Sequence, residues 1–222
     1  MTQSLKASFN KALEDNNFAN GLPDTGFNYL SHIMIEELIE TFIKNEKRFF
    51  IDGKTLSIKG LEEKLVHTFD LGENVKVNLT GFADRIDHVG DKIRILDYKS
   101  GKVEDKDVII KSDTEDIHDI KDKSLQLCIY KYLYAKNHGD VSVKNIEPGI
   151  FGLLDVKNPY FPLVVECDDF KDDRFMETCE DMFIDLFREM LNPEISFQQV
   201  EDEKKCNNCD YQNICKRNPK TW

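Results

Sequence analysis

Residues 79–101, LTGFADRIDHVGDKIRILDYKSG, contain two short runs rich in β-branched and aliphatic residues, separated by Gly90-Asp91. A glycine in the first position of a two-residue loop favours a type II′ hairpin turn, so the segment predicts two antiparallel strands. In that register Val89 pairs with Lys92, and counting outward places Asp84 opposite Asp97.

Like charges that face each other across a strand pair are destabilising, so two carboxylates at this point indicate a cation between them. Lys99 falls on the same face as Asp97 because side chains alternate along a strand. The two carboxylates can bind a divalent cation through their oxygens, and the ammonium can orient an attacking water. The plain alternative is a set of solvated or mutually paired charges, which is our interpretation of Arg85, Asp87 and Arg94.

Helical and strand periodicities flank this hairpin. A weak helical pattern within residues 1–25 precedes a strong one from residue 25 to Lys47, which we expect to cover one side of a sheet. Residues 57–69 predict a strand that turns at 72–74. Downstream, the pattern predicts a solvated acidic loop over 101–123, a helix over Ser124–Asn137, two strands within 146–166 and a helix over 168–191. We interpret Cys128, Cys167 and Cys179 as core thiols.

The hairpin, with Asp84 followed by Asp97-Tyr98-Lys99, resembles the active-site hairpin of the PD-(D/E)XK nuclease superfamily, in particular the RecB and AddB nuclease domains. The resemblance implies that Asp84, Asp97 and Lys99 are catalytic, with Mg²⁺ or Mn²⁺ on the two aspartates and on the main-chain carbonyl of Tyr98. Gln126 and Tyr130, one helical turn apart, match a further motif of these nucleases that lines the active site.

The same resemblance bears on two other side chains. A glutamate on the first strand of the family can approach the metal, and Glu62 is the better-placed candidate, with its neighbour Glu63 on the opposite face. Nucleases of the family often carry a histidine on the preceding helix. In RecB and AddB relatives it lies well upstream, so we interpret His32 as an ordinary helix residue.

A cysteine-rich segment closes the sequence, with Cys206, Cys209 and Cys215 in C-x₂-C-x₅-C spacing that favours zinc or an iron–sulfur cluster. The spacing resembles the tail of AddB nucleases and of CRISPR-adaptation nucleases. There a fourth, upstream cysteine completes a [4Fe–4S] cluster, whereas the first cysteine here is Cys128. We therefore expect an incomplete or absent cluster, and a chain that corresponds to a C-terminal piece of the family's domain.

Composition limits the class of protein. The chain has 222 residues, a formal charge of −12 and six cysteines. That charge argues against gripping nucleic acid through the overall field, so any contact with DNA must be local or supplied by a partner. The sequence contains neither a secretory signal nor an apolar run of membrane-spanning length, and we expect a cytoplasmic protein with no membrane partner.

These observations and the resemblance imply a restriction-endonuclease-like α/β/α sandwich, with a mixed sheet that begins as a three-stranded meander. We expect N-terminal helices over 1–50, a nuclease core over 51–200 and the cysteine-rich tail over 201–222. The implied function is that of a Mg²⁺-dependent deoxyribonuclease of the exonuclease type in double-strand-break repair, working on DNA with a helicase–nuclease partner. The alternatives are a non-catalytic DNA-binding module and a structural remnant of a nuclease domain.

Overall fold

The structure is a computed structural model that describes residues 3–16, 26–51, 55–155, 157–171, 173–196, 199–200, 206 and 209–216. Of residues 26–28 and 48–51 only the backbone is described. The chain divides into two compact units, Met1–Ile184 and Asp185–Trp222. The predicted catalytic residues all belong to the first unit.

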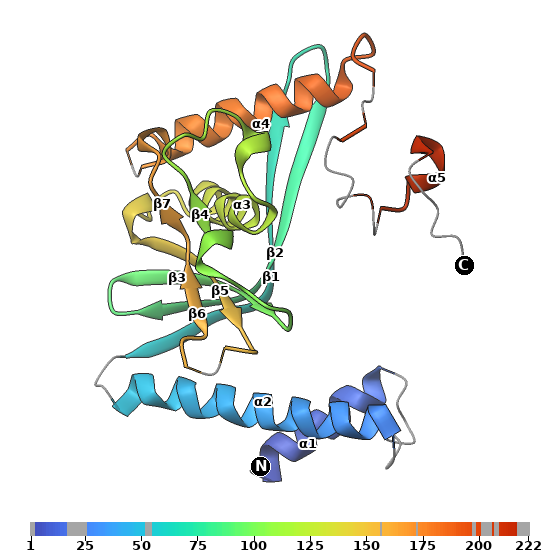
Figure 1. The fold of residues 1–222 in the computed structure, drawn as a ribbon. Coiled ribbons are helices and arrows are strands. Elements are labelled where there is room, and N and C mark those ends of the chain that lie inside the picture. The colour runs from blue at the N-terminus through green and yellow to red at the C-terminus, as the bar shows by residue number, and fades with distance from the viewer. Residues whose placement is uncertain are drawn as a thin grey trace. The chain divides into compact units, whose positions relative to one another are not determined.

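A five-stranded mixed sheet forms the centre of the first unit (Figure 1), in the order β1-β2-β3-β5-β6. The strands are β1 (Leu56–Asp70), β2 (Lys76–Val89), β3 (Lys92–Lys99), β5 (Ile146–Gly152) and β6 (Tyr160–Pro162). The first three form the predicted antiparallel meander, whereas β5 runs parallel to β3. Since a parallel neighbour requires a crossover, the chain passes through helix α3 (Asp122–Asn137) between these two strands.

The hairpin between β2 and β3 has the predicted register, with Val89 opposite Lys92 and Asp87 opposite Arg94. Gly90 has a φ of +61°, a conformation that glycine adopts without steric cost, while Asp91 keeps a negative φ. This combination agrees with a type II′ turn. The turn therefore fixes which side chains of β2 and β3 face each other.

Helices cover both faces of the sheet. Helix α2 (Gly26–Ile51) lies on one face, where the Phe42 ring meets Tyr98 and Phe151 edge-on at centroid distances of 5.5 and 4.9 Å. Helix α3 lies on the other face, so close that a Cβ added to Gly81 would come within 3.0 Å of the Tyr130 ring. Helix α4 (Phe175–Leu191) joins α3 there through Phe183, which meets Tyr132 at 5.2 Å. The predicted α/β/α layering is confirmed.

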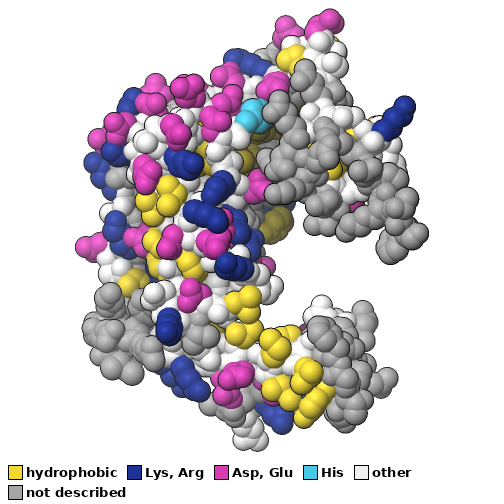
Figure 2. Space-filling view, viewed as in Figure 1, with side chains coloured by type: hydrophobic (Ala, Val, Ile, Leu, Met, Phe, Trp, Pro, Cys, Tyr) yellow, Lys and Arg dark blue, Asp and Glu magenta, His cyan; other side chains and the backbone are white. Residues whose placement is uncertain are grey.

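Only part of α2 serves to cover the sheet. Its N-terminal half exposes several large apolar side chains, visible as a hydrophobic group in Figure 2: Tyr29, Leu30, Ile33, Met34 and Ile35. The shorter helix α1 (Gln3–Asp15) contacts this half through Phe9, whose ring stacks on His32. None of the helices in the described residues is long and apolar enough to cross a membrane.

The acidic run after β3 is ordered, which corrects the predicted solvated loop over 101–123. It contains two short 3₁₀ turns, Asp105–Asp107 and Ile117–Asp119, and strand β4 (Ile109–Ile110), which pairs with β7 (Val164–Val165). Apolar residues placed between the acids are buried and anchor the segment: Val103, Val108, Ile110, Ile117 and Ile120. The sequence did not indicate these buried positions, because acidic residues outnumber the buried apolar residues in this segment.

Other elements follow the sequence with shifted ends. Strand β5 begins at Ile146, and the strand expected after it is divided between β6 and β7, which lie in different sheets. The last long helix begins at Phe175 rather than Asp168, because residues Asp168–Phe170 form a 3₁₀ turn. The prediction that Cys128, Cys167 and Cys179 are core thiols is confirmed, since all three are buried.

The second unit contains the end of α4 and the short helix α5 (Gln212–Cys215). Its cysteine segment turns through main-chain hydrogen bonds. The Cys209 N–H donates to the Cys206 carbonyl over 3.1 Å, and the Cys215 N–H donates to the Tyr211 carbonyl over 3.0 Å. Cys209 is exposed, and Cys206 and Cys215 are half-buried.

Candidate active site

The predicted catalytic residues lie where β2 and β3 separate. The last pair of the ladder joins Arg85 to Leu96, and the next pair, Asp84 with Asp97, is not formed. Instead, the Asp84 carboxylate accepts a hydrogen bond from the Tyr98 N–H over 2.6 Å. The carboxylate thus takes the place of a main-chain acceptor and is fixed beside the segment that carries Asp97 and Lys99.

Asp97 and Lys99 share one face of β3, as the alternation of side chains requires. The Lys99 Nζ lies 2.7 Å from Asp97 Oδ2, and the Asp97 side chain is 5% exposed whereas that of Lys99 is 33% exposed. Asp97 Oδ2 is buried and, beyond this ion pair, has no hydrogen-bond partner. The site therefore combines a buried carboxylate oxygen with an ammonium that reaches solvent.

Gln126 and Tyr130 extend to the same carboxylate from α3. The Gln126 amide donates to Asp97 Oδ1 over 3.0 Å and to the Tyr130 hydroxyl over 2.9 Å. The Tyr130 hydroxyl is 3.5 Å from Asp97 Oδ1. Burial and the charge of Asp97 raise the pKa of Tyr130 to about 12, so its hydroxyl stays protonated at neutral pH. Gln126 therefore sets the orientation of Asp97, and Tyr130 supports Gln126.

The first strand reaches this site at an irregular position. Leu61 pairs with Arg85 and Glu63 with Ala83, so Glu62 lies across from Asp84. Glu62 has a φ of +50°, rare for a residue other than glycine, and its side chain is exposed. Glu63 is half-buried and faces α3, where its charge helps, after burial, to raise the pKa of Tyr134. The role of Glu62 as a metal ligand stays a prediction.

His32 makes its contacts within the pair of N-terminal helices. Its ring stacks on Phe9 at a centroid distance of 5.1 Å, and its Nε2 lies 3.4 Å from a Glu36 carboxylate oxygen one helical turn away. These contacts agree with our interpretation of His32 as a helix residue, which stays a prediction.

Two sets of residues are predicted to bind metals: the pair Asp84 and Asp97, and the three C-terminal cysteines. Among the described residues, no three or more His, Cys, Asp or Glu side chains gather in a geometry that could hold a metal ion. Cys206, Cys209 and Cys215 are not among such groups, and their role as metal ligands stays a prediction. Asp84 and Asp97 supply two carboxylates, and the buried Asp97 Oδ2 suits a hard divalent cation.

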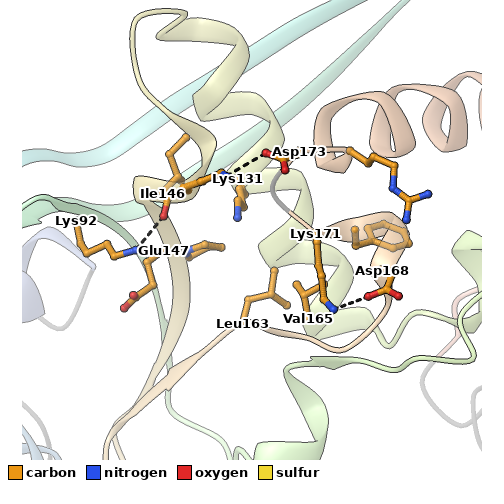
Figure 3. A pocket seen from close by; sticks show the side chains of 13 residues that line it. Lys92, Lys131, Ile146, Glu147, Leu163, Val165, Asp168, Lys171 and Asp173 are labelled. Carbon is orange, nitrogen blue, oxygen red and sulfur yellow. Dashed lines mark hydrogen bonds and ion pairs between the residues drawn. The ribbon is translucent and has the colours of Figure 1, made fainter.

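A half-open cavity of about 650 Å³ lies elsewhere in the first unit (Figure 3), at the amino-terminal ends of β3 and β5. Its charged lining residues are Lys92, Lys131, Lys144, Glu147, Asp168, Lys171, Asp173 and Arg174. Asp97 and Lys99 come from the opposite, carboxyl-terminal end of β3, and none of the predicted catalytic residues lines the cavity. A cleft large enough for a small molecule is thus separate from the predicted catalytic carboxylates.

The sequence did not predict the burial of three charged residues on the opposite face of the sheet from the site. Arg85, Asp87 and Arg94 are mutually paired, as one of our readings predicted, but they are buried rather than solvated, with Asp87 fully enclosed. The Arg94 guanidinium donates two hydrogen bonds of 2.8 Å to Asp87, and Arg85 forms ion pairs with Asp87 at 2.8 Å and with Glu46 of α2 at 2.6 Å. The available signal was their alternation, which places all three on the face that α2 covers.

Comparison with known families agrees with this geometry. The sequence model of the PD-(D/E)XK nuclease superfamily matches residues 2–216, so the chain belongs to that superfamily. Membership implies a nuclease-type function. None of the curated proteins compared with the chain matches it. The solved structure titled "Crystal structure of SSO0001" has a TM-score of 0.34 and 13% identity over 81% of this chain and 68% of that chain, a likeness too low to carry an argument.

Proposed function

We propose that the chain is a divalent-metal-dependent deoxyribonuclease that hydrolyses phosphodiester bonds at Asp84, Asp97 and Lys99. The observation that carries the proposal is the convergence of both carboxylates on the Asp97-Tyr98-Lys99 segment, with Lys99 Nζ at 2.7 Å from Asp97 Oδ2. Superfamily membership supplies the reaction class. The substrate, the metal and the mode of cutting are part of the proposal.

Each residue has a defined task in this reaction. Asp84 and Asp97 would hold Mg²⁺ or Mn²⁺, with the Tyr98 carbonyl as a further ligand. A bound ion supplies Lewis-acid stabilisation of the phosphate and lowers the pKa of water. Lys99, partly exposed, orients the attacking water and offsets the charge that develops on the phosphoryl oxygens. Gln126 holds Asp97 through its Oδ1, which leaves Oδ2 directed away from the helix amide.

The finer assignment is to the RecB and AddB type, acting as an exonuclease in double-strand-break repair beside a helicase partner. Support comes from three motifs in one chain: the hairpin, the Gln126-x₃-Tyr130 pair and the C-terminal cysteines. The hydrogen bonds from Gln126 to Asp97 and Tyr130 add a physical reason for the second motif.

The test uses Asp84→Asn and Lys99→Met, with end-labelled DNA and either Mg²⁺ or Mn²⁺. We expect each variant to lose at least about 100-fold in cleavage rate, because each removes a group that stabilises the transition state, while DNA binding is retained. Asp91→Asn is the matched control, since Asp91 is an exposed carboxylate in the turn of the same hairpin.

The end-label also reports the mode of cutting, because an exonuclease releases mononucleotides or short products from one end. Wild-type cleavage that both variants retain would contradict the catalytic assignment. A folded wild-type chain that binds DNA without cutting it would favour the alternative of a non-catalytic module.

A further inference from the structure

The two catalytic carboxylates have neighbours in the chain that meet on the opposite face of the sheet. Asp84 is followed by Arg85, and Asp97 is followed by Tyr98. Because side chains alternate, Arg85 and Tyr98 point toward α2 while the aspartates point toward α3. The Arg85 guanidinium donates a hydrogen bond to the Tyr98 hydroxyl over 3.4 Å. β2 and β3 are thus also joined on the α2 face of the sheet, next to Arg85 and Leu96, the last pair of their ladder.

Tyr98 is held firmly on that face. Its ring lies edge-on to Phe42 of α2 and to Phe151 of β5, at centroid distances of 5.5 and 5.9 Å. Its main-chain N–H is the donor that fixes Asp84 on the other face. Any shift of Tyr98 therefore moves the Asp84 carboxylate and, through the chain on either side, Asp97 and Lys99.

Arg85 is held by α2 in turn. Its side chain is 5% exposed and forms ion pairs with Glu46 at 2.6 Å and with Asp87 at 2.8 Å. Burial by itself lowers the pKa of Arg85, but the hydrogen bond to Tyr98 and the charge of Glu46 outweigh this effect and raise it. The guanidinium therefore remains charged and links three elements: α2, β2 and β3.

We propose that Arg85, acting through Tyr98 and anchored by Glu46, is a positioning residue that sets the spacing of Asp84 and Asp97 and hence the affinity of the site for its metal. The inference rests on the proposed function, since it concerns the same carboxylates. It assigns α2 a part in catalysis, although its linking residues lie on the face of the sheet away from the site.

The chain offers a closely matched pair of variants, Arg85→Lys and Arg94→Lys. Both arginines are about equally buried and both pair with Asp87, so lysine keeps the buried charge balanced at either position. Lysine lacks the planar fork of donors that lets Arg85 reach Glu46, Asp87 and Tyr98 together. Arg94 instead lies over the Tyr160 ring, 5.5 Å from its centroid, several residues from the catalytic pair.

The experiment measures Mn²⁺ affinity by titration calorimetry, well below the melting temperature of each variant, and cleavage of DNA at saturating Mn²⁺. We expect both substitutions to lower the melting temperature. Only Arg85→Lys should weaken Mn²⁺ binding, by about 10-fold, the usual cost of losing a group that orients metal ligands. Tyr98→Phe, which keeps the aromatic contacts and removes the hydroxyl, should weaken binding in the same direction and by less.

The outcomes separate the two proposals. Equal losses of Mn²⁺ affinity in Arg85→Lys and Arg94→Lys, or no loss in either, would overturn the positioning role while leaving the nuclease assignment intact. A folded wild-type chain that neither binds Mn²⁺ nor cleaves DNA would overturn the proposed function, and the positioning role with it.

Discussion

Gln126, a neutral side chain, holds the proposed catalytic carboxylate of Asp97 in place. Its amide uses both hydrogens, one on Asp97 Oδ1 at 3.0 Å and one on the Tyr130 hydroxyl at 2.9 Å. The Tyr130 hydroxyl is itself farther from Asp97, at 3.5 Å. The helix thus controls Asp97 chiefly through Gln126, and Tyr130 acts one step removed.

We therefore expect Gln126→Met to lower the cleavage rate more than Tyr130→Phe. The first substitution removes both hydrogen bonds and should cost about 10-fold to 100-fold, as for other groups that orient metal ligands. The second keeps the ring, which packs against Gly81, and leaves the Gln126–Asp97 bond in place. Rates at saturating metal compare the two, and a larger loss in Tyr130→Phe would contradict this order.

At this scale the sequence predicts which residues meet, but not how they meet. The two-residue turn at Gly90-Asp91 fixes the register, so the approach of Asp84 to Asp97 follows from counting. The separation of the strands after Arg85 does not follow from counting, because the Tyr98 N–H bonds to a side chain instead of the main chain. Alternation places Arg85 on one face with Asp87 and Arg94, but only the structure shows that Glu46 of α2, a helix distant in sequence, reaches Arg85 there.

At the scale of elements, the segment between β3 and α3 connects the strand that carries Asp97 and Lys99 to the helix that carries Gln126. It is tied to α3 by the Ser124 hydroxyl, which donates to the carbonyl oxygens of Asp107 and Ile109 at 3.0 and 3.3 Å. Lys123 adds an ion pair with Asp107 at 2.8 Å. The segment thereby sets where α3 begins.

Ile110 is the side chain to change in this segment, because it is 1% exposed and lies in β4. We expect Ile110→Ala to destabilise the fold by about 2–5 kcal/mol, the range for removing a buried isoleucine side chain beyond Cβ. Urea denaturation measures the change. Lys111→Ala, at the exposed next position, is the control and should have little effect. Equal midpoints for Ile110→Ala and wild type would restore the solvated-loop interpretation.

The sequence hides this element because strand and helix periodicities need several residues to be recognised, and β4 has only two. Its partner β7 is also two residues long and lies more than fifty residues away. Long elements with a strong period, such as α3 and β1, were predicted to within about two residues of their ends. The mixed character of the sheet was predicted with the help of the family resemblance, but the parallel pairing of β5 with β3 was not predicted.

On the scale of the whole first unit, a group of polar side chains joins β1, α3 and α4. Glu180 of α4 forms an ion pair with Lys136 and accepts a hydrogen bond from the Tyr132 hydroxyl over 3.1 Å. The His67 ring of β1 lies edge-on to Tyr132 at 5.8 Å. The three elements that enclose this part of the core therefore share one titratable cluster.

The pKa values of His67 and Glu180 are both lowered in the folded protein. Burial and then the charge of Lys136 lower the pKa of His67 below its ordinary 6.5. Burial alone would raise the pKa of Glu180, but the hydrogen bond and charge of Lys136 outweigh it and lower that pKa below 4.5. For a group whose pKa is lower in the folded state, the unfolded chain takes up its proton first as pH falls. The free energy of unfolding therefore decreases on acidification, below pH 6.5 for His67 and below pH 4.5 for Glu180.

His67→Phe tests this dependence, because phenylalanine keeps a ring against Tyr132 and removes the titration. The wild-type melting temperature should fall as pH is lowered from about 8 to about 5, by roughly 2–4 °C for each kcal/mol lost in a chain of this size. The decline in His67→Phe should be shallower over the same interval, because its folded and unfolded states no longer differ in proton uptake at this position. If His67→Phe follows the wild-type slope instead, the acid sensitivity of the fold must come from groups other than His67.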